Sequence, residues 1–215
     1  TARVVVDRST GNPRLVRFAG HLPRPAGDTA AEKALDLLSR HAPAFGLSAP
    51  LRELEPVAET PDPLGGTIVT FRQVYLGLEV FGTMLRVRLD EEGAARSVNG
   101  RVVSDIDLDP VPRVAAVDAE TVAKRHIAKD SGIPVSDLEI GGRELLVYRS
   151  GLLRGLPGAN HLAWAIDIAV PPTLREVVTI DAHSGAVLDQ RSEIHHLDRA
   201  VHLGRIPNRI WSEGD

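Results

Sequence analysis

The chain has 215 residues, of which 25% are charged and 43% hydrophobic, the balance of a soluble globular protein. A formal net charge of −4 provides no surplus of positive charge, so no nucleic-acid partner is expected. The absence of cysteine excludes disulfides and thiolate zinc sites. No apolar run reaches the ~18 residues that a membrane-spanning helix needs. The length allows one large domain or two smaller ones.

The N-terminal part predicts a β-hairpin followed by a helix. The strands Val4–Val6 and Leu15–Phe18 flank a D-x-x-T-G turn that begins at Asp7. A capping-box pattern starts a helix after Thr29, and apolar residues at helical spacing continue it to about His41.

The stretch Phe71–Gly93 predicts two strands that fold back on each other at Gly77. In the second strand, apolar and polar residues alternate with a period of two, as in a strand with one buried face. The acidic turn Asp90–Gly93 closes this strand. Neighbouring strands are expected over Leu51–Glu59, from Thr67 onward and over Ala95–Val103.

A second helix-and-strand unit is predicted after the acidic, proline-containing segment Asp105–Arg113. Asp118 is the expected N-cap of a helix over Ala119–Asp130, with Val117 and Val122 as a hydrophobic staple. Three strands are then expected over Leu145–Tyr148, Leu162–Val170 and Val177–Ile180. The predicted class is therefore α+β, with a helix followed by antiparallel strands twice in succession.

The middle of the chain resembles the fungalysin/thermolysin propeptide motif, roughly F-x-Q-x-Y-x-G-x-x-V-F-G, an acidic turn and S-x-N-G. The matching residues are Phe71, Gln73, Tyr75, Gly77, Val80, Phe81, Gly82, Asn99 and Gly100. Asn99 and Gly100 also predict a turn or a bulge. Further on, a segment that contains Asp181 and Gly185 resembles the closing motif of the PepSY domain. The two motifs in tandem resemble the pro-regions of thermolysin-like and fungalysin-like zinc metalloproteases.

This resemblance implies two tandem cystatin-like subdomains, each a helix packed on a curved antiparallel sheet. The expected ranges are 1–104 for the N-terminal subdomain, 105–113 for a linker, 114–190 for the PepSY-like subdomain and 191–215 for an extended tail toward a protease domain.

No motif for catalysis is present, and no catalytic residue or metal site is expected. The HExxH zinc motif, a G-x-S-x-G elbow and a phosphate-binding loop are all absent. Two metal sites stay open as alternatives. His195, His196 and His202 cluster and could bind a metal ion, although they lack an acidic partner at ligand spacing. The carboxylates of Asp105–Asp109 could bind calcium, although the remaining ligands of a calcium loop are missing. A hydrolase built on those carboxylates is the enzyme alternative.

The resemblance implies a non-catalytic propeptide that is the intramolecular chaperone and inhibitor of a cognate secreted M4/M36-type metalloprotease. Zinc and calcium are expected only in the protease domain, and a signal peptide is expected to have been removed before Thr1. A stand-alone PepSY-type module that binds the cell wall or inhibits a protease is the alternative function.

The candidate partner-binding residues lie in two places. The tail is expected to lie in the protease cleft through Ser192, Glu193, Ile194, His195, His196 and Leu197. Processing is expected between His196 and Leu197, or at Arg199. Gln73 is the candidate elsewhere, because a polar side chain among strand aromatics needs a partner, either in a buried network or across an interface.

Overall fold

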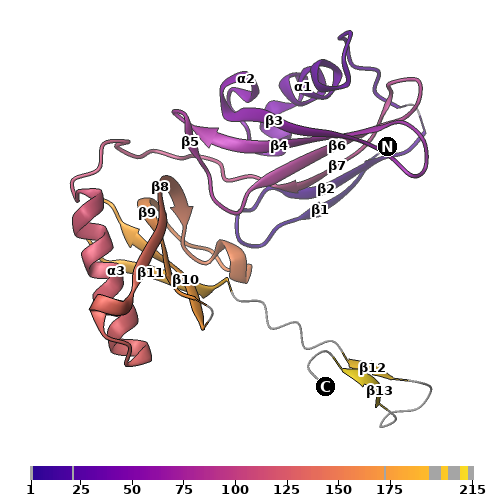
Figure 1. The fold of residues 1–215 in the computed structure, drawn as a ribbon. Helices are drawn as coiled ribbons and strands as arrows, with labels where there is room; N and C mark the ends of the chain where they lie inside the picture. Colours follow the sequence, from indigo (N-terminus) through magenta and orange to yellow (C-terminus); the bar gives the residue numbers. More distant parts are fainter. Residues whose placement is uncertain (1, 21, 172, 194–199, 203–208, 213–215) are drawn as a thin grey trace.

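The computed structural model describes residues 2–20, 22–171, 173–193, 200–202 and 209–212. The protein is α+β, with antiparallel sheets and few helices, as predicted (Figure 1). Two sheets carry the described fold, and we call them the N-terminal sheet (β1–β7) and the C-terminal sheet (β8–β11). A separate pair of short strands, β12 (Ala200–His202) and β13 (Arg209–Ser212), follows them. That the sheets are tandem cystatin-like subdomains stays a prediction.

The N-terminal sheet has the strand order β1-β2-β7-β6-β4-β3, with the short β5 paired to β4. Its strands are β1 (Ala2–Val6), β2 (Pro13–Phe18), β3 (Leu54–Pro61), β4 (Thr67–Tyr75), β5 (Leu78–Glu79), β6 (Met84–Leu89) and β7 (Ala95–Arg101). Helices α1 (Ala30–Arg40) and α2 (Pro50–Glu53) both lie over the same face of this sheet (Figure 1). A 3₁₀ turn, Ala42–Phe45, connects them.

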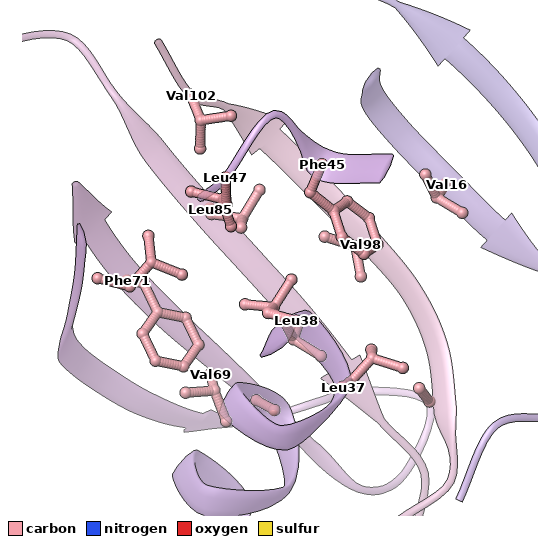
Figure 2. Packing of buried hydrophobic residues seen from close by; sticks show 14 of the residues in the cluster. Val16, Leu37, Leu38, Phe45, Leu47, Val69, Phe71, Leu85, Val98 and Val102 are labelled. Atoms are coloured by element: carbon pink, nitrogen blue, oxygen red, sulfur yellow. The ribbon is translucent and has the colours of Figure 1, made fainter. Parts of the chain in front are cut away.

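Helix α1 begins at the predicted capping box and covers the first core. The Thr29 side chain accepts a hydrogen bond from the Glu32 amide, and the Glu32 carboxylate accepts one from the Thr29 amide. Leu37 and Leu38 point from the helix into the apolar side chains of the strands, among them Phe71 and Leu85 (Figure 2). Full burial of each such side chain contributes roughly 1.5–3 kcal/mol, so this core fixes the helix on one face.

The C-terminal sheet has the order β11-β10-β9-β8 and is covered by helix α3 (Ala116–Ser131). Its strands are β8 (Glu139–Arg149), β9 (Asn160–Val170), β10 (Leu174–Asp181) and β11 (Val187–Ser192). Two 3₁₀ turns, Val135–Asp137 and Leu152–Arg154, flank β8. The core joins Ala119, Ala123 and Ile127 of the helix to Ile166, Ile168, Val178 and Ile180 of the sheet.

Two predicted boundaries were wrong. Helix α3 begins at Ala116, and its N-cap is Ala115 rather than Asp118. Asp118 lies in the first turn instead, where a negative charge is favourable at the positive end of the helix dipole. Val117 is therefore a helical residue that is 62% exposed, and it forms no staple. The predicted strand Leu51–Glu59 is likewise divided, because α2 occupies its first residues and β3 starts at Leu54.

Four hairpin turns share one electrostatic arrangement, in which an aspartate starts the turn. One carboxylate oxygen accepts hydrogen bonds from backbone amides of the turn, and the other faces a basic side chain on a strand of the same sheet. The pairs are Asp7 with Arg101, Asp62 with Arg88, Asp90 with Arg96 and Asp181 with His161. Each aspartate thus fixes both the conformation of its turn and the position of a neighbouring strand.

Asp7 illustrates how this arrangement depends on pH. Burial alone would raise the pKa of the Asp7 carboxyl, but hydrogen bonds from Ser9 and from Arg101 outweigh burial, and the pKa is lowered. Because the folded-state pKa lies below the unfolded value of about 3.9, ionised Asp7 stabilises the fold above that pH. The stabilisation is lost as the pH falls through the folded-state pKa.

We therefore predict that Asp7→Asn lowers the free energy of unfolding at pH 7 by about 1.5–3 kcal/mol, the usual contribution of a hydrogen bond to a charged group. The difference from the wild type should shrink below about pH 4. Urea unfolding at both pH values measures it, with Asp107→Asn, a change at an exposed aspartate, as the control. A difference that is equally large at pH 3 would contradict this account.

Gly100 corrects the interpretation of Asn99–Gly100 as a turn or bulge. It lies inside β7 and pairs with Leu85 of β6. Its φ is +141°, and a Cβ atom at this position would collide with the carbonyl oxygen of Met84. Only glycine fits here because the two strands approach each other too closely for a side chain.

Gly100→Ala should therefore lower the free energy of unfolding by more than about 1 kcal/mol. Gly142→Ala is the matched control, because Gly142 also lies in a strand but has no atom within 4 Å of an added Cβ and has no positive φ. Thermal unfolding of both variants provides the comparison, and equal melting temperatures would refute the steric explanation.

Candidate partner-binding site at the junction of the two sheets

The propeptide-like motif begins on β4 and passes through the tightest turn of the N-terminal sheet. Phe71 is fully buried in the core below α1. At the end of the strand, Leu76 and Gly77 both have positive φ, 50° and 84°, and connect Tyr75 to its partner Leu78. Two-residue hairpin loops favour this conformation. The prediction of a hairpin at Gly77 is thus correct, but its second arm is the short β5.

Gln73 is an internal clamp between β4 and the segment after β7. Its side-chain nitrogen donates to the Val103 carbonyl at 2.7 Å, and its side-chain oxygen accepts from the Val103 amide at 2.8 Å. The residue is 2% exposed. These contacts agree with the buried-network alternative, and a role of Gln73 in partner binding stays a prediction.

Tyr75 holds the segment that leaves β7. Its hydroxyl donates to the Leu108 carbonyl at 3.0 Å and accepts from the Leu108 amide at 3.2 Å. Ile106 and Leu108 pack against a buried cluster that Tyr75 also touches. The predicted linker 105–113 contains no helix or strand, but these contacts attach part of it to the N-terminal sheet.

The V-F-G end of the motif lies where the two sheets meet. Val80 forms a parallel bridge with Val147 of β8, and the Phe81 amide donates to the Val147 carbonyl at 2.9 Å. Val80 and Val147 are fully buried, together with Val103 and Leu152. Gly82 follows with a φ of 76°, and a side chain here would press on Leu153. The motif therefore joins the N-terminal sheet to the first strand of the C-terminal sheet.

A second contact joins the motif to β11. The Phe81 ring stacks on Tyr148 with centroids 6.2 Å apart, and the guanidinium of Arg191 lies 4.3 Å above the Phe81 centroid. Such a cation–π contact contributes about 0.5–2 kcal/mol. Burial, together with the neighbouring Asp189 carboxylate, raises the pKa of Tyr148 to about 12, so the phenol stays protonated at neutral pH. Sequence patterns did not identify Arg191, because its partner is 110 residues away in the chain.

The structure describes only the first two residues of the predicted cleft-binding segment. Ser192 is the last residue of β11 and pairs with Glu176 of β10, so the strand extends beyond the predicted boundary at residue 190. The Glu193 amide donates to the Arg175 carbonyl at 2.8 Å. Ile194, His195, His196, Leu197 and Arg199 lie outside the described residues. The cleft-binding and processing roles of this segment stay predictions.

The candidate carboxylates do not gather around a common point. Within the described ranges, no three histidine, cysteine, aspartate or glutamate side chains are placed to hold a metal ion. Asp109 accepts a hydrogen bond from the Val111 amide and faces Arg113 at 4.0 Å. Asp181 and Gly185, from the PepSY-like motif, form the last of the four aspartate turns.

Every helix that the structure describes is too short or too polar to cross a membrane.

The clamp formed by Gln73 provides a test. Gln73→Leu leaves the amide and carbonyl of Val103 buried without partners, and we expect the free energy of unfolding to fall by about 1–3 kcal/mol per orphaned group. Chemical denaturation measures this loss. Thr121→Val removes one hydrogen bond from an exposed helical position and is the control. A Gln73→Leu protein as stable as the wild type would contradict the stabilising role of the clamp.

Comparison with known proteins agrees with the motif. The model of the fungalysin/thermolysin propeptide motif matches residues 52–102. The thermostable neutral protease NprT of Geobacillus stearothermophilus is 26% identical over 177 residues, and the thermolysin of Alicyclobacillus acidocaldarius is 25% identical over 174. Both alignments cover 78% of this chain, which spans about a third (31%) of the length of each relative.

Among solved structures, the Bacillus megaterium YpeB C-terminal domain is similar at 14% identity and a TM-score of 0.37, over 85% of this chain and 72% of that one. The PepSY resemblance of the second half stays a prediction. The motif match and the two protease relatives confirm the predicted resemblance to a thermolysin-like propeptide. The chain carries the fungalysin/thermolysin propeptide motif and is similar over most of its length to thermolysin-type proteases, as a thermolysin-like pro-region would be.

Proposed function

We propose that this chain is the pro-region of a thermolysin-like zinc metalloprotease and that it templates the folding of the catalytic domain and inhibits it. The observation that carries the proposal is the propeptide motif over residues 52–102, in a chain that is similar to thermolysin-type proteases over 78% of its length. Under this proposal, zinc and calcium are ligands of the catalytic domain. The chain is secreted together with that domain after its signal peptide has been removed.

The junction described above supports the templating role. A folding template is most effective when its own surface is already ordered, because binding then costs less conformational entropy. The bridge from Val80 and Phe81 to Val147, and the contact of Phe81 with Arg191, tie the two sheets together. A partner that contacts both sheets thus meets a surface whose two halves are already connected. By mass action, such a surface stabilises the folded catalytic domain that it binds.

The inhibitory role is assigned to the segment that follows β11. An extended peptide can occupy a protease cleft as an added strand. The pairing of Ser192 with Glu176 and the bond from Glu193 to Arg175 support this assignment, because they attach the start of the segment to the C-terminal sheet. We propose that Ser192–Leu197 lies in the cleft and that processing occurs at His196–Leu197, with Arg199 as the second candidate.

The test uses the HExxH-containing catalytic domain encoded in the same genome as this chain. The added chain should raise the refolding yield of the denatured domain and slow its hydrolysis of a peptide substrate. Leu197→Asp should weaken inhibition about tenfold, equivalent to ~1.4 kcal/mol, because thermolysin-type clefts prefer an apolar residue after the cut. Leu197→Ile is the matched control and should inhibit as the wild type does.

The refolding yield should be the same for the three proteins, since Leu197 is assigned to inhibition alone. A wild-type chain that neither raises the yield nor slows hydrolysis would refute the proposed function. Equal inhibition by both Leu197 variants would refute the placement of the tail.

A further inference from the structure

The face of the N-terminal sheet opposite α1 carries arginines that have no acidic partner. The alternation along β6 turns Leu85 and Val87 toward the core below α1, so Arg86 between them lies on the opposite face. In β2, Val16 faces the core and Arg17 the opposite side. Arg3 of β1 pairs directly with Arg17 and shares its face. We call Arg3, Arg17 and Arg86 the arginine face.

Ion pairs elsewhere on this side of the sheet make the arginine face distinct. Arg88 faces Asp62, and Arg101 faces Asp7 at 2.9 Å. In the part of the chain that the structure describes, no carboxylate lies within 4.0 Å of Arg3, Arg17 or Arg86. These three guanidinium groups thus form no ion pair among the described residues, in a chain whose net charge is −4.

The position of the charges costs stability. Arg3 and Arg17 are directly opposite each other on adjacent antiparallel strands. Like charges in this position are destabilising, because their Cβ atoms are only about 5 Å apart. An acidic group bound between them would remove the repulsion.

The surface beside these arginines is suited to a protein partner. The register places Leu15 opposite Asn99 and Asn99 opposite Arg86. A shallow groove runs along this row, and Met84, which is 40% exposed, lies at its side. The groove therefore offers an amide and apolar side chains next to the guanidinium group of Arg86, and its one acidic lining residue, Asp7, is paired with Arg101. This mixture of apolar contact and charge is typical of protein interfaces, in which methionine and arginine are enriched.

We propose that the arginine face docks an acidic patch of the catalytic domain, so that charge steers the encounter of the two. This inference rests on the proposed function and names the surface of the pro-region that meets its partner first. Complementary charge raises association rates by roughly 10–10³-fold, and the gain falls as salt is added. A net-negative pro-region with one positive face would orient itself in the field of an acidic patch before contact.

The experiment measures the association rate of the full chain with the catalytic domain by stopped-flow fluorescence at 20 and 300 mM NaCl. The test variant is R17E/R86E. The matched control is R52E/R125E, which changes the net charge by the same amount at exposed arginines on α2 and α3 that have no described ion pair. The wild type and the control should associate at similar rates that fall with salt. R17E/R86E should associate on the order of tenfold more slowly at low salt and lose most of the salt dependence.

Thermal unfolding of each variant shows whether it is folded, and R17Q/R86Q replaces the test variant if the charge reversal prevents folding. If R17E/R86E and R52E/R125E slow association equally, the arginine face is not the docking surface. If the wild type fails to bind the domain at all, it is the proposed function that fails. Binding of wall teichoic acid that R17E/R86E abolishes, with unchanged protease association, would assign the face to an anionic polymer and overturn the proposal.

Discussion

The arrangement of the two sheets depends on the short backbone contact between Val80–Phe81 and Val147. It is the point at which the strands of the N-terminal sheet continue into hydrogen bonding with β8, the edge strand of the C-terminal sheet. The contact is buried below apolar side chains, where a backbone hydrogen bond is protected from water and costly to break. Through this contact, a motif of about a dozen residues connects the two helix-covered sheets and sets their relative position.

Charged side chains then fix the conformation of the turns and the positions of neighbouring strands, which the apolar cores alone do not determine. The aspartate turns each use one oxygen for the backbone and one for a basic side chain, so turn geometry and strand position are set by the same group. The arginine face departs from this rule, because its guanidinium groups form no ion pair among the described residues. The proposed docking surface therefore differs from the paired turns that hold the strands in place.

Local patterns predicted the elements that depend on short-range chemistry. The capping box at Thr29, the alternation in β6 and the hairpin at Gly77 each reside in a few neighbouring residues, and the α+β class followed from them. Contacts between distant residues were not predictable. Gln73 contacts Val103, which is 30 residues away in the chain, and Phe81 contacts Arg191, which is 110 residues away. Local sequence periodicity carries no information about contacts at such separations. The prediction of Asp118 as the N-cap was wrong because the helix begins about one turn earlier, at Ala116, and Asp118 lies in its first turn.

The propeptide motif joins both sheets into one unit. Native-state hydrogen exchange of the Phe81 amide tests it most directly, because this amide donates to Val147 across the junction. The account predicts that the Phe81 amide exchanges only by global unfolding, with the same free energy as core amides of Val69 and Val178. Exchange of the Phe81 amide at the rate of an exposed loop, while both cores remain protected, would contradict it.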